Sequence, residues 1–266
     1  MQSTWYATRG TFLTRATAIG AGLAAGDLQI GEARAASVEA DTSAARAIID
    51  TALLAEQVAM TFYYTALTTP RVMRDHRLAG RSANPNNPGL PPGGDPGHVH
   101  QLQAALDAEV RHADALAAAG AASPLRRVYF PARTFTRLGS AVQEDSLLGV
   151  MAGLETTLVG LYIAAASELM RHDRPQLAAL AAEILGVEAE HRLLSRLLVP
   201  ILPANNLTLE EAPFTGVSDA RSALQPFVTA SAHRAGAAVA AFAIPTRAQA
   251  ARVIGRYRTR RVRRFL

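Results

Sequence analysis

Four stretches of the chain carry apolar residues at the spacing of an α-helix, with polar residues at the other positions. In the first stretch Leu54, Val58 and Phe62 recur every four residues and so lie along one helix face. The same pattern predicts helices over about residues 42–68, 98–119, 143–171 and 175–198. Because such helices bury their apolar faces against each other, we expect an all-α fold built on a four-helix bundle with extra C-terminal helices.

Pro and Gly residues divide these stretches from the rest of the chain. Residues 70–97 are rich in Pro, Gly and Asn, which predicts an insertion loop between the first two helices. Residues 204–266 differ in character and include a short helix near Ser218 and a basic helix that begins near Pro245. We therefore expect the bundle to occupy residues 37–203 and a C-terminal extension to follow it.

The third stretch raises the question of a membrane span. Residues 146–167 contain a single charged residue, Glu155, and are long enough to cross a bilayer. A lone carboxylate at the centre of a bilayer costs roughly 2.5–3.5 kcal/mol on insertion scales, and this segment is rich in Gly, Ala, Ser and Thr. These two features favour a buried helix of a bundle.

Charge is distributed unevenly along the chain, which has a net charge of +5. Residues 1–36 combine Arg9 and Arg15 with a small apolar run and an Ala33-Arg34-Ala35 sequence, which is typical of an export signal. The segment resembles a degenerate twin-arginine signal, because Gly10 stands where the second Arg belongs. Its presence predicts localisation in the periplasm or cell envelope.

Two helices carry the sequence Glu-x-x-His, at Glu109/His112 and at Glu188/His191. A spacing of three residues puts both side chains on one helix face, where a carboxylate and an imidazole can bind one metal ion. The other two helices each carry a single acidic residue within their apolar stretch, Glu56 and Glu155.

The two halves of the bundle look like copies of one helix pair. A Tyr follows the single Glu seven residues later in both, as Tyr63 and Tyr162, and seven residues are about two helical turns. We expect these Tyr side chains to donate hydrogen bonds near the carboxylates. Buried acids must be paired, protonated or bound to cations, so the sequence predicts either two divalent cations or a set of protonated carboxyl groups.

Alternating Glu and Glu-x-x-His helices form the ligand pattern of dinuclear carboxylate bundles. Residues 42–203 resemble the ferritin-like superfamily, and most closely its bacterial exported ferritin-like domain proteins, which are similar to plant stress- and desiccation-related proteins. The resemblance implies that two Fe ions are the cofactor, although the same ligand types suit Mn. It implies terminal carboxylate ligands at Glu56 and Glu155, bridging ligands at Glu109 and Glu188, and one imidazole ligand for each metal at His112 and His191.

This resemblance implies a di-iron oxidoreductase that reacts with O₂ or peroxide, as a ferroxidase or in peroxide detoxification. The alternative is a stress protein of the cell envelope in which metal only stabilises the bundle. The sequence has no Cys, which excludes a rubredoxin-like electron-donor domain within it and predicts an external electron donor. The insertion and the C-terminal extension argue against assembly into a ferritin cage, and the Arg-rich tail suggests contact with an anionic surface.

Overall fold

The computed structural model describes residues 28–79, 98–140, 143–198, 213–233 and 238–261, without the side chains of 28–40, 76, 79 and 255–261. The chain divides into two units, residues 1–40 and 41–266, and the predicted bundle belongs to the second. Most of the predicted export segment, and most of the predicted insertion loop, lie outside the described residues.

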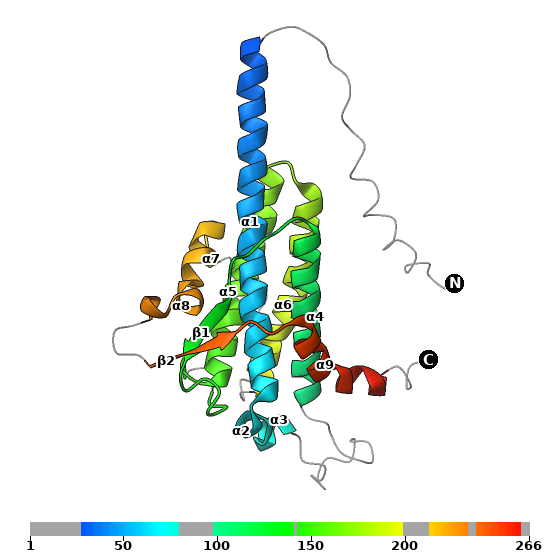
Figure 1. The fold of residues 1–266 in the computed structure, drawn as a ribbon, viewed down its shortest axis with the longest axis vertical. Coiled ribbons are helices and arrows are strands. Elements are labelled where there is room, and N and C mark those ends of the chain that lie inside the picture. Colours follow the sequence, from blue (N-terminus) through cyan, green and yellow to red (C-terminus); the bar gives the residue numbers. More distant parts are fainter. Residues whose placement is uncertain (1–27, 80–97, 141–142, 199–212, 234–237, 262–266) are drawn as a thin grey trace, which may run out of the picture. The chain divides into compact units, whose positions relative to one another are not determined.

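Four long helices form the body of the second unit, and Figure 1 shows them running alongside one another. They are α1 (Leu28–Thr68, of which the part from residue 41 belongs here), α4 (Val99–Ala118), α5 (Leu147–Arg171) and α6 (Pro175–Leu198). Helices α4 and α6 coincide with predicted stretches, whereas α1 begins at Leu28, well before the predicted start at about residue 42. The all-α helical bundle is confirmed. Two short helices follow α1, namely α2 (Pro70–Met73) and α3 (His76–Ala79).

Local hydrogen bonds set where these helices stop. At the end of α4 the amide of Gly120, which has φ 99°, donates to Ala117 O, and the next amide donates to Leu116 O. The end of α5 has the same arrangement, with Asp173 at φ 53° in the place of the Gly. Both ends are Schellman motifs, in which a left-handed residue lets two amides satisfy the last carbonyls. The second one lets α6 begin directly at Pro175, antiparallel to α5.

The start of α5 lies four residues later than predicted. The Ser146 hydroxyl accepts a hydrogen bond from Gly149 N at 3.2 Å, which makes Ser146 the N-cap. The preceding Gln143 belongs to a turn, since its amide donates to Ser140 O. Within the described residues α5 is also the one helix long and apolar enough to cross a membrane, and 72% of its most apolar window is buried inside the protein. Most of the apolar surface of this window is therefore buried in the protein core.

A two-stranded antiparallel sheet lies against the bundle. Its strands are β1 (Arg127–Pro131) and β2 (Val239–Ala243), with Val128 opposite Phe242. The pattern of the sequence predicted neither of these strands. Phe130 of β1 is fully buried and stacks edge-on against Phe62 of α1, which joins the sheet to the core.

The C-terminal extension contains short helices and one longer helix. They are α7 (Val217–Ala223), α8 (Gln225–Val228), a 3-10 turn (Ala230–Ala232) and α9 (Arg247–Arg261). Helix α7 is fixed to α5 because Val217 N donates to Glu168 Oε1 at 2.8 Å. The predicted domain boundaries at 36, 203 and 204 stay predictions.

Candidate metal centre

Each long helix contributes one glutamate to the interior of the bundle. Glu56 lies on α1, Glu109 on α4, Glu155 on α5 and Glu188 on α6, and all four are 0% exposed. Helical periodicity explains this placement, because each Glu occupies a position of its helix's apolar face. Four carboxyl groups are therefore held together in an otherwise apolar core, where an isolated charge is costly.

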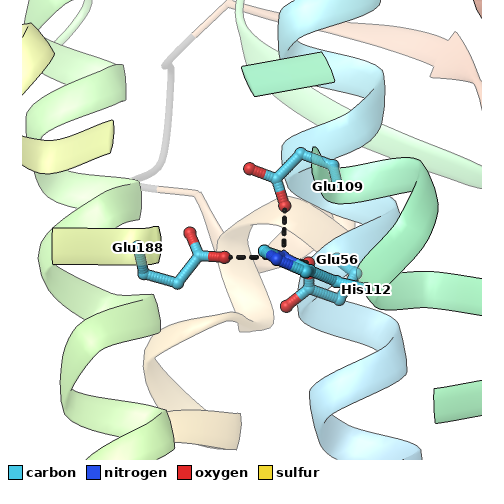
Figure 2. Close-up of side chains that lie close together, drawn as sticks. All are labelled: Glu56, Glu109, His112 and Glu188. Atoms are coloured by element: carbon cyan, nitrogen blue, oxygen red, sulfur yellow. Dashed lines mark hydrogen bonds and ion pairs between the residues drawn. The ribbon is translucent and has the colours of Figure 1, made fainter. Parts of the chain in front are cut away.

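Two histidines complete the group, and each lies one turn after a glutamate on its own helix. His112 is 9% exposed and His191 is 7% exposed, so both rings lie almost wholly inside the bundle. Both turn the Nδ1 atom toward the carboxylates. Figure 2 shows His112 of α4 pointing between Glu109 and Glu188, with Glu56 beside it.

The six side chains form two overlapping sets of potential ligands, and in each set the ligand atoms lie within 4.8 Å of one another. The first set is Glu56, Glu109, His112 and Glu188. The second set is Glu109, Glu155, Glu188 and His191. The two carboxylates that both sets share are the ones expected to bridge two metals.

The shared carboxylates divide their oxygens between the two histidines. Glu109 directs Oε2 toward His112 Nδ1, at 3.7 Å, and Oε1 toward His191 Nδ1, at 2.9 Å. Glu188 places Oε1 3.0 Å from His112 Nδ1 and Oε2 3.4 Å from His191 Nδ1. Each shared carboxylate thus offers one oxygen to each half of the centre, which is the arrangement that a bridging ligand requires.

The two tyrosines are fully buried and bind the remaining glutamates crosswise. Tyr63 of α1 donates its hydroxyl to Glu155 Oε1 of α5 at 2.5 Å. Tyr162 of α5 donates to Glu56 Oε1 of α1. The sequence placed each Tyr on the face of its own helix's Glu, whereas the structure pairs each Tyr with the Glu of the other half.

The carboxyl groups at the two ends of the centre are hard to ionise. Burial, followed by repulsion from Glu188, raises the pKa of both Glu56 and Glu155 well above the ordinary value. At Glu109 burial opposes ionisation, but the positive charge of His191 and hydrogen bonds from both histidines outweigh it and lower the pKa. The site therefore already contains one carboxylate that is held ionised between two imidazoles.

The imidazoles show the complementary effect. Burial works against a charged ring, but hydrogen bonds to Glu109 and Glu188 raise the pKa of His112. For His191 burial again opposes the charge, while the carboxylate of Glu109 and hydrogen bonds to the same two glutamates raise the pKa. The directions of these pKa shifts show that the cluster favours positive charge in its interior. A bound cation would supply that charge.

Five carboxylate oxygens of the centre form no hydrogen bond of good geometry with the described residues, although a histidine Nδ1 atom lies near four of them. These buried atoms are both carboxylate oxygens of Glu109 and of Glu188, together with Glu155 Oε2. Buried polar atoms in folded proteins almost always form hydrogen bonds. This group of carboxylate oxygens therefore indicates that a binding partner is missing from the site. The donor set, oxygen-rich with two imidazole nitrogens, suits Fe or Mn rather than a structural zinc site.

Comparison with known proteins agrees with this geometry. The family model of the ferritin-like domain matches residues 44–199, which include all six side chains. The chain belongs to the ferritin-like family. No curated protein and no solved structure matches it. The expected superfamily is therefore confirmed, whereas the exported, desiccation-related subtype stays a prediction.

All eight residues singled out in the sequence lie together in one place. The four glutamates and two histidines converge at the centre, and the two tyrosines touch its outer carboxylates. The sequence could not predict two details. Each tyrosine donates to the glutamate of the other helix pair, and both histidines direct Nδ1, not Nε2, toward the carboxylates. Both depend on how the two helix pairs are docked, for which no local pattern exists.

Proposed function

We propose that this ferritin-like protein binds two iron ions and reacts with O₂ or peroxide, as a ferroxidase or a peroxide-detoxifying oxidoreductase. The single observation that carries the proposal is the division of the Glu109 and Glu188 oxygens between His112 and His191. A pair of shared carboxylates would bring two metals close together, as two-electron chemistry on one small oxidant requires.

The residues divide into three roles. Glu56 and His112 would hold one ion, Glu155 and His191 would hold the other, and Glu109 and Glu188 would hold both. When bound, a pair of ferrous ions supplies two electrons to an oxidant.

The tyrosines would fix the outer carboxylates. Tyr63 donates to Oε1 of Glu155 and Tyr162 donates to Oε1 of Glu56. The second oxygen of Glu155 has no hydrogen bond among the described residues and that of Glu56 faces His112 Nδ1 at 3.2 Å, so these two Oε2 atoms would bind the metals. The pKa of both phenols is raised by burial and then by the nearby carboxylates, mainly Glu155 for Tyr63 and Glu56 for Tyr162. Both hydroxyls therefore stay protonated and act as hydrogen-bond donors at neutral pH.

The test is anaerobic loading of metal-free protein with Fe²⁺, followed by exposure to air or peroxide. We expect consumption of O₂ together with the near-ultraviolet absorption of a ferric pair, and loss of both in Glu188→Ala. Glu190→Ala is the matched control, because Glu190 lies two residues away on the same helix and is exposed. Tight binding of two ions with no O₂ or peroxide consumption would replace this proposal by that of a non-catalytic, metal-stabilised bundle.

Export to the periplasm or cell envelope is a separate proposal, supported by the sequence of residues 1–36 alone. Its test is N-terminal sequencing of protein recovered from the envelope fraction of the native host. We expect the mature chain to begin just after Ala35. Recovery of the unprocessed chain from the cytoplasmic fraction would refute it.

A further inference from the structure

A groove open to solvent is bordered by residues of α1, β1 and α8. Its volume is about 420 Å³, which falls within the ~300–1,000 Å³ of sites that bind small molecules. Leu54 of α1 lines it, and this position is two residues, or about 200° around the helix axis, from Glu56. The groove therefore lies on the side of α1 away from the metal centre.

The elements that border the groove are held in place by contacts of their own. Just before β1, Ala122 N donates to Asp50 Oδ1 of α1 at 2.6 Å, which fixes the segment that leads into the strand. Figure 1 shows α8 beside β1, and there Phe227 packs against Phe130 with ring centroids 5.6 Å apart. The groove is thus formed before a ligand binds, which lowers the entropic cost of binding.

The residues that line the groove are of two kinds. Leu54, Leu125 and Val228 are half-buried and supply an apolar surface. Arg126 and Arg127 are exposed, and neither side chain forms an ion pair or a hydrogen bond with the residues that the structure describes. No Asp or Glu is among the described residues of the lining. The groove therefore offers two guanidinium groups next to an apolar surface.

We propose that this groove binds a small amphipathic anion, which has a carboxylate or phosphate head and an apolar body. A guanidinium group binds either head through two parallel hydrogen bonds, and two such groups line the groove. The apolar body would contact Leu54 and Val228, which removes apolar surface from water. Tyr129 also lines the groove, and its ring and hydroxyl suit the apolar and polar parts of such a ligand.

The experiment is isothermal titration calorimetry of the full chain with octanoate and, separately, with octyl phosphate. We expect at least one of them to bind at a single site, and the tighter of the two identifies the head group. Acetate lacks the apolar body and 1-octanol lacks the charge, so each should bind at least about tenfold more weakly. Each titration is run on chelator-treated protein and on protein incubated with Mn²⁺, and we expect the same Kd in both because the groove lies away from the metal centre.

Variants locate the site. Arg126→Gln combined with Arg127→Gln should weaken binding of the amphipathic anion by at least about tenfold, because both charged donors are lost. The matched control combines Arg71→Gln with Arg74→Gln, which removes the same charge from exposed residues in and next to α2. This control should keep the wild-type Kd. Thermal melting followed by circular dichroism checks that both double variants stay folded.

Several results would overturn the proposal. Neither octanoate nor octyl phosphate may fail to bind alone and leave it standing if both fail, so the absence of binding by both is decisive. An unchanged Kd in the Arg126 and Arg127 variant, or an equal loss of affinity in the two double variants, would place the ligand elsewhere. Binding of 1-octanol or acetate as tight as that of the amphipathic anion would remove the chemical basis of the site. Binding that requires Mn²⁺ would place the ligand at the metal centre.

Discussion

Removal of Glu188 tests the bridging geometry through stability, without relying on activity. Glu188 lies between His112 and His191 with one oxygen near each. If it holds both ions, Glu188→Ala should abolish binding of the pair and not of one ion alone. The variant should still fold, because it removes little apolar packing and one costly buried carboxylate.

The size of the expected effect follows from linkage between metal binding and folding. An ion that binds only the folded chain stabilises it by about 2.7 kcal/mol at a free concentration of ~100 times its Kd. Two such ions contribute about 5 kcal/mol. For a chain of this size each kcal/mol raises Tm by ~2–4 °C, so saturating Fe²⁺ should raise the Tm of the wild-type protein by ~10–20 °C.

The assay is anaerobic thermal unfolding of chelator-treated protein, measured with and without Fe²⁺ or Mn²⁺. Glu188→Ala should lose nearly the whole metal-dependent rise in Tm, and His191→Ala should keep about half, since the ion beside Glu56 and His112 retains its ligands. The control Glu190→Ala should behave like wild type. A wild-type Tm that does not respond to metal would refute an occupied centre, and a full response in Glu188→Ala would refute the bridging role.

Further variants probe the surroundings of the centre. Tyr63→Phe and Tyr162→Phe should each lower the free energy of unfolding of the metal-free protein by ~1–3 kcal/mol in urea titrations, because each strands a buried carboxylate oxygen. Tyr162→Phe should keep most O₂ consumption, and its complete loss would give the phenol a direct part in the reaction. In α5, Gly153→Ala should stabilise by up to ~1 kcal/mol, since a Cβ there meets no atom within 4 Å. Gly160→Ala should destabilise by ~1–3 kcal/mol, because its Cβ would lie 2.8 Å from the Phe214 ring, and equal urea midpoints for these two Gly variants would contradict the packing described.

The bundle and the centre are the parts that the sequence could predict, and for one physical reason. Periodic apolar residues give a buried helix face, and a glutamate on such a face needs a partner. Glu56 and Glu155 were identifiable because each is the lone acid in a long apolar stretch. The two Glu-x-x-His sequences then supplied the remaining ligand types at a spacing that puts them on one face.

The sheet could not be predicted in the same way. Strands β1 and β2 are each five residues long and more than a hundred residues apart in the sequence. A strand as short as Val239–Ala243 has no periodic pattern that distinguishes it from a loop or a helix. Its stability comes from pairing with Arg127–Pro131 and from aromatic contacts, as where Phe242 packs against Phe130. Such long-range contacts are absent from any local window of sequence.

Contacts between the two helix pairs make the metal centre a single unit. His112 Nδ1 lies 3.0 Å from Glu188 but 3.7 Å from Glu109 of its own helix. His191 Nδ1 likewise lies 2.9 Å from Glu109 and 3.4 Å from Glu188. Both tyrosine hydrogen bonds and the shortest contact of each histidine therefore join one helix pair to the other. Docking of the two pairs and completion of the ligand sets are therefore the same event, which is why we expect metal binding to stabilise the whole bundle and not one half of it.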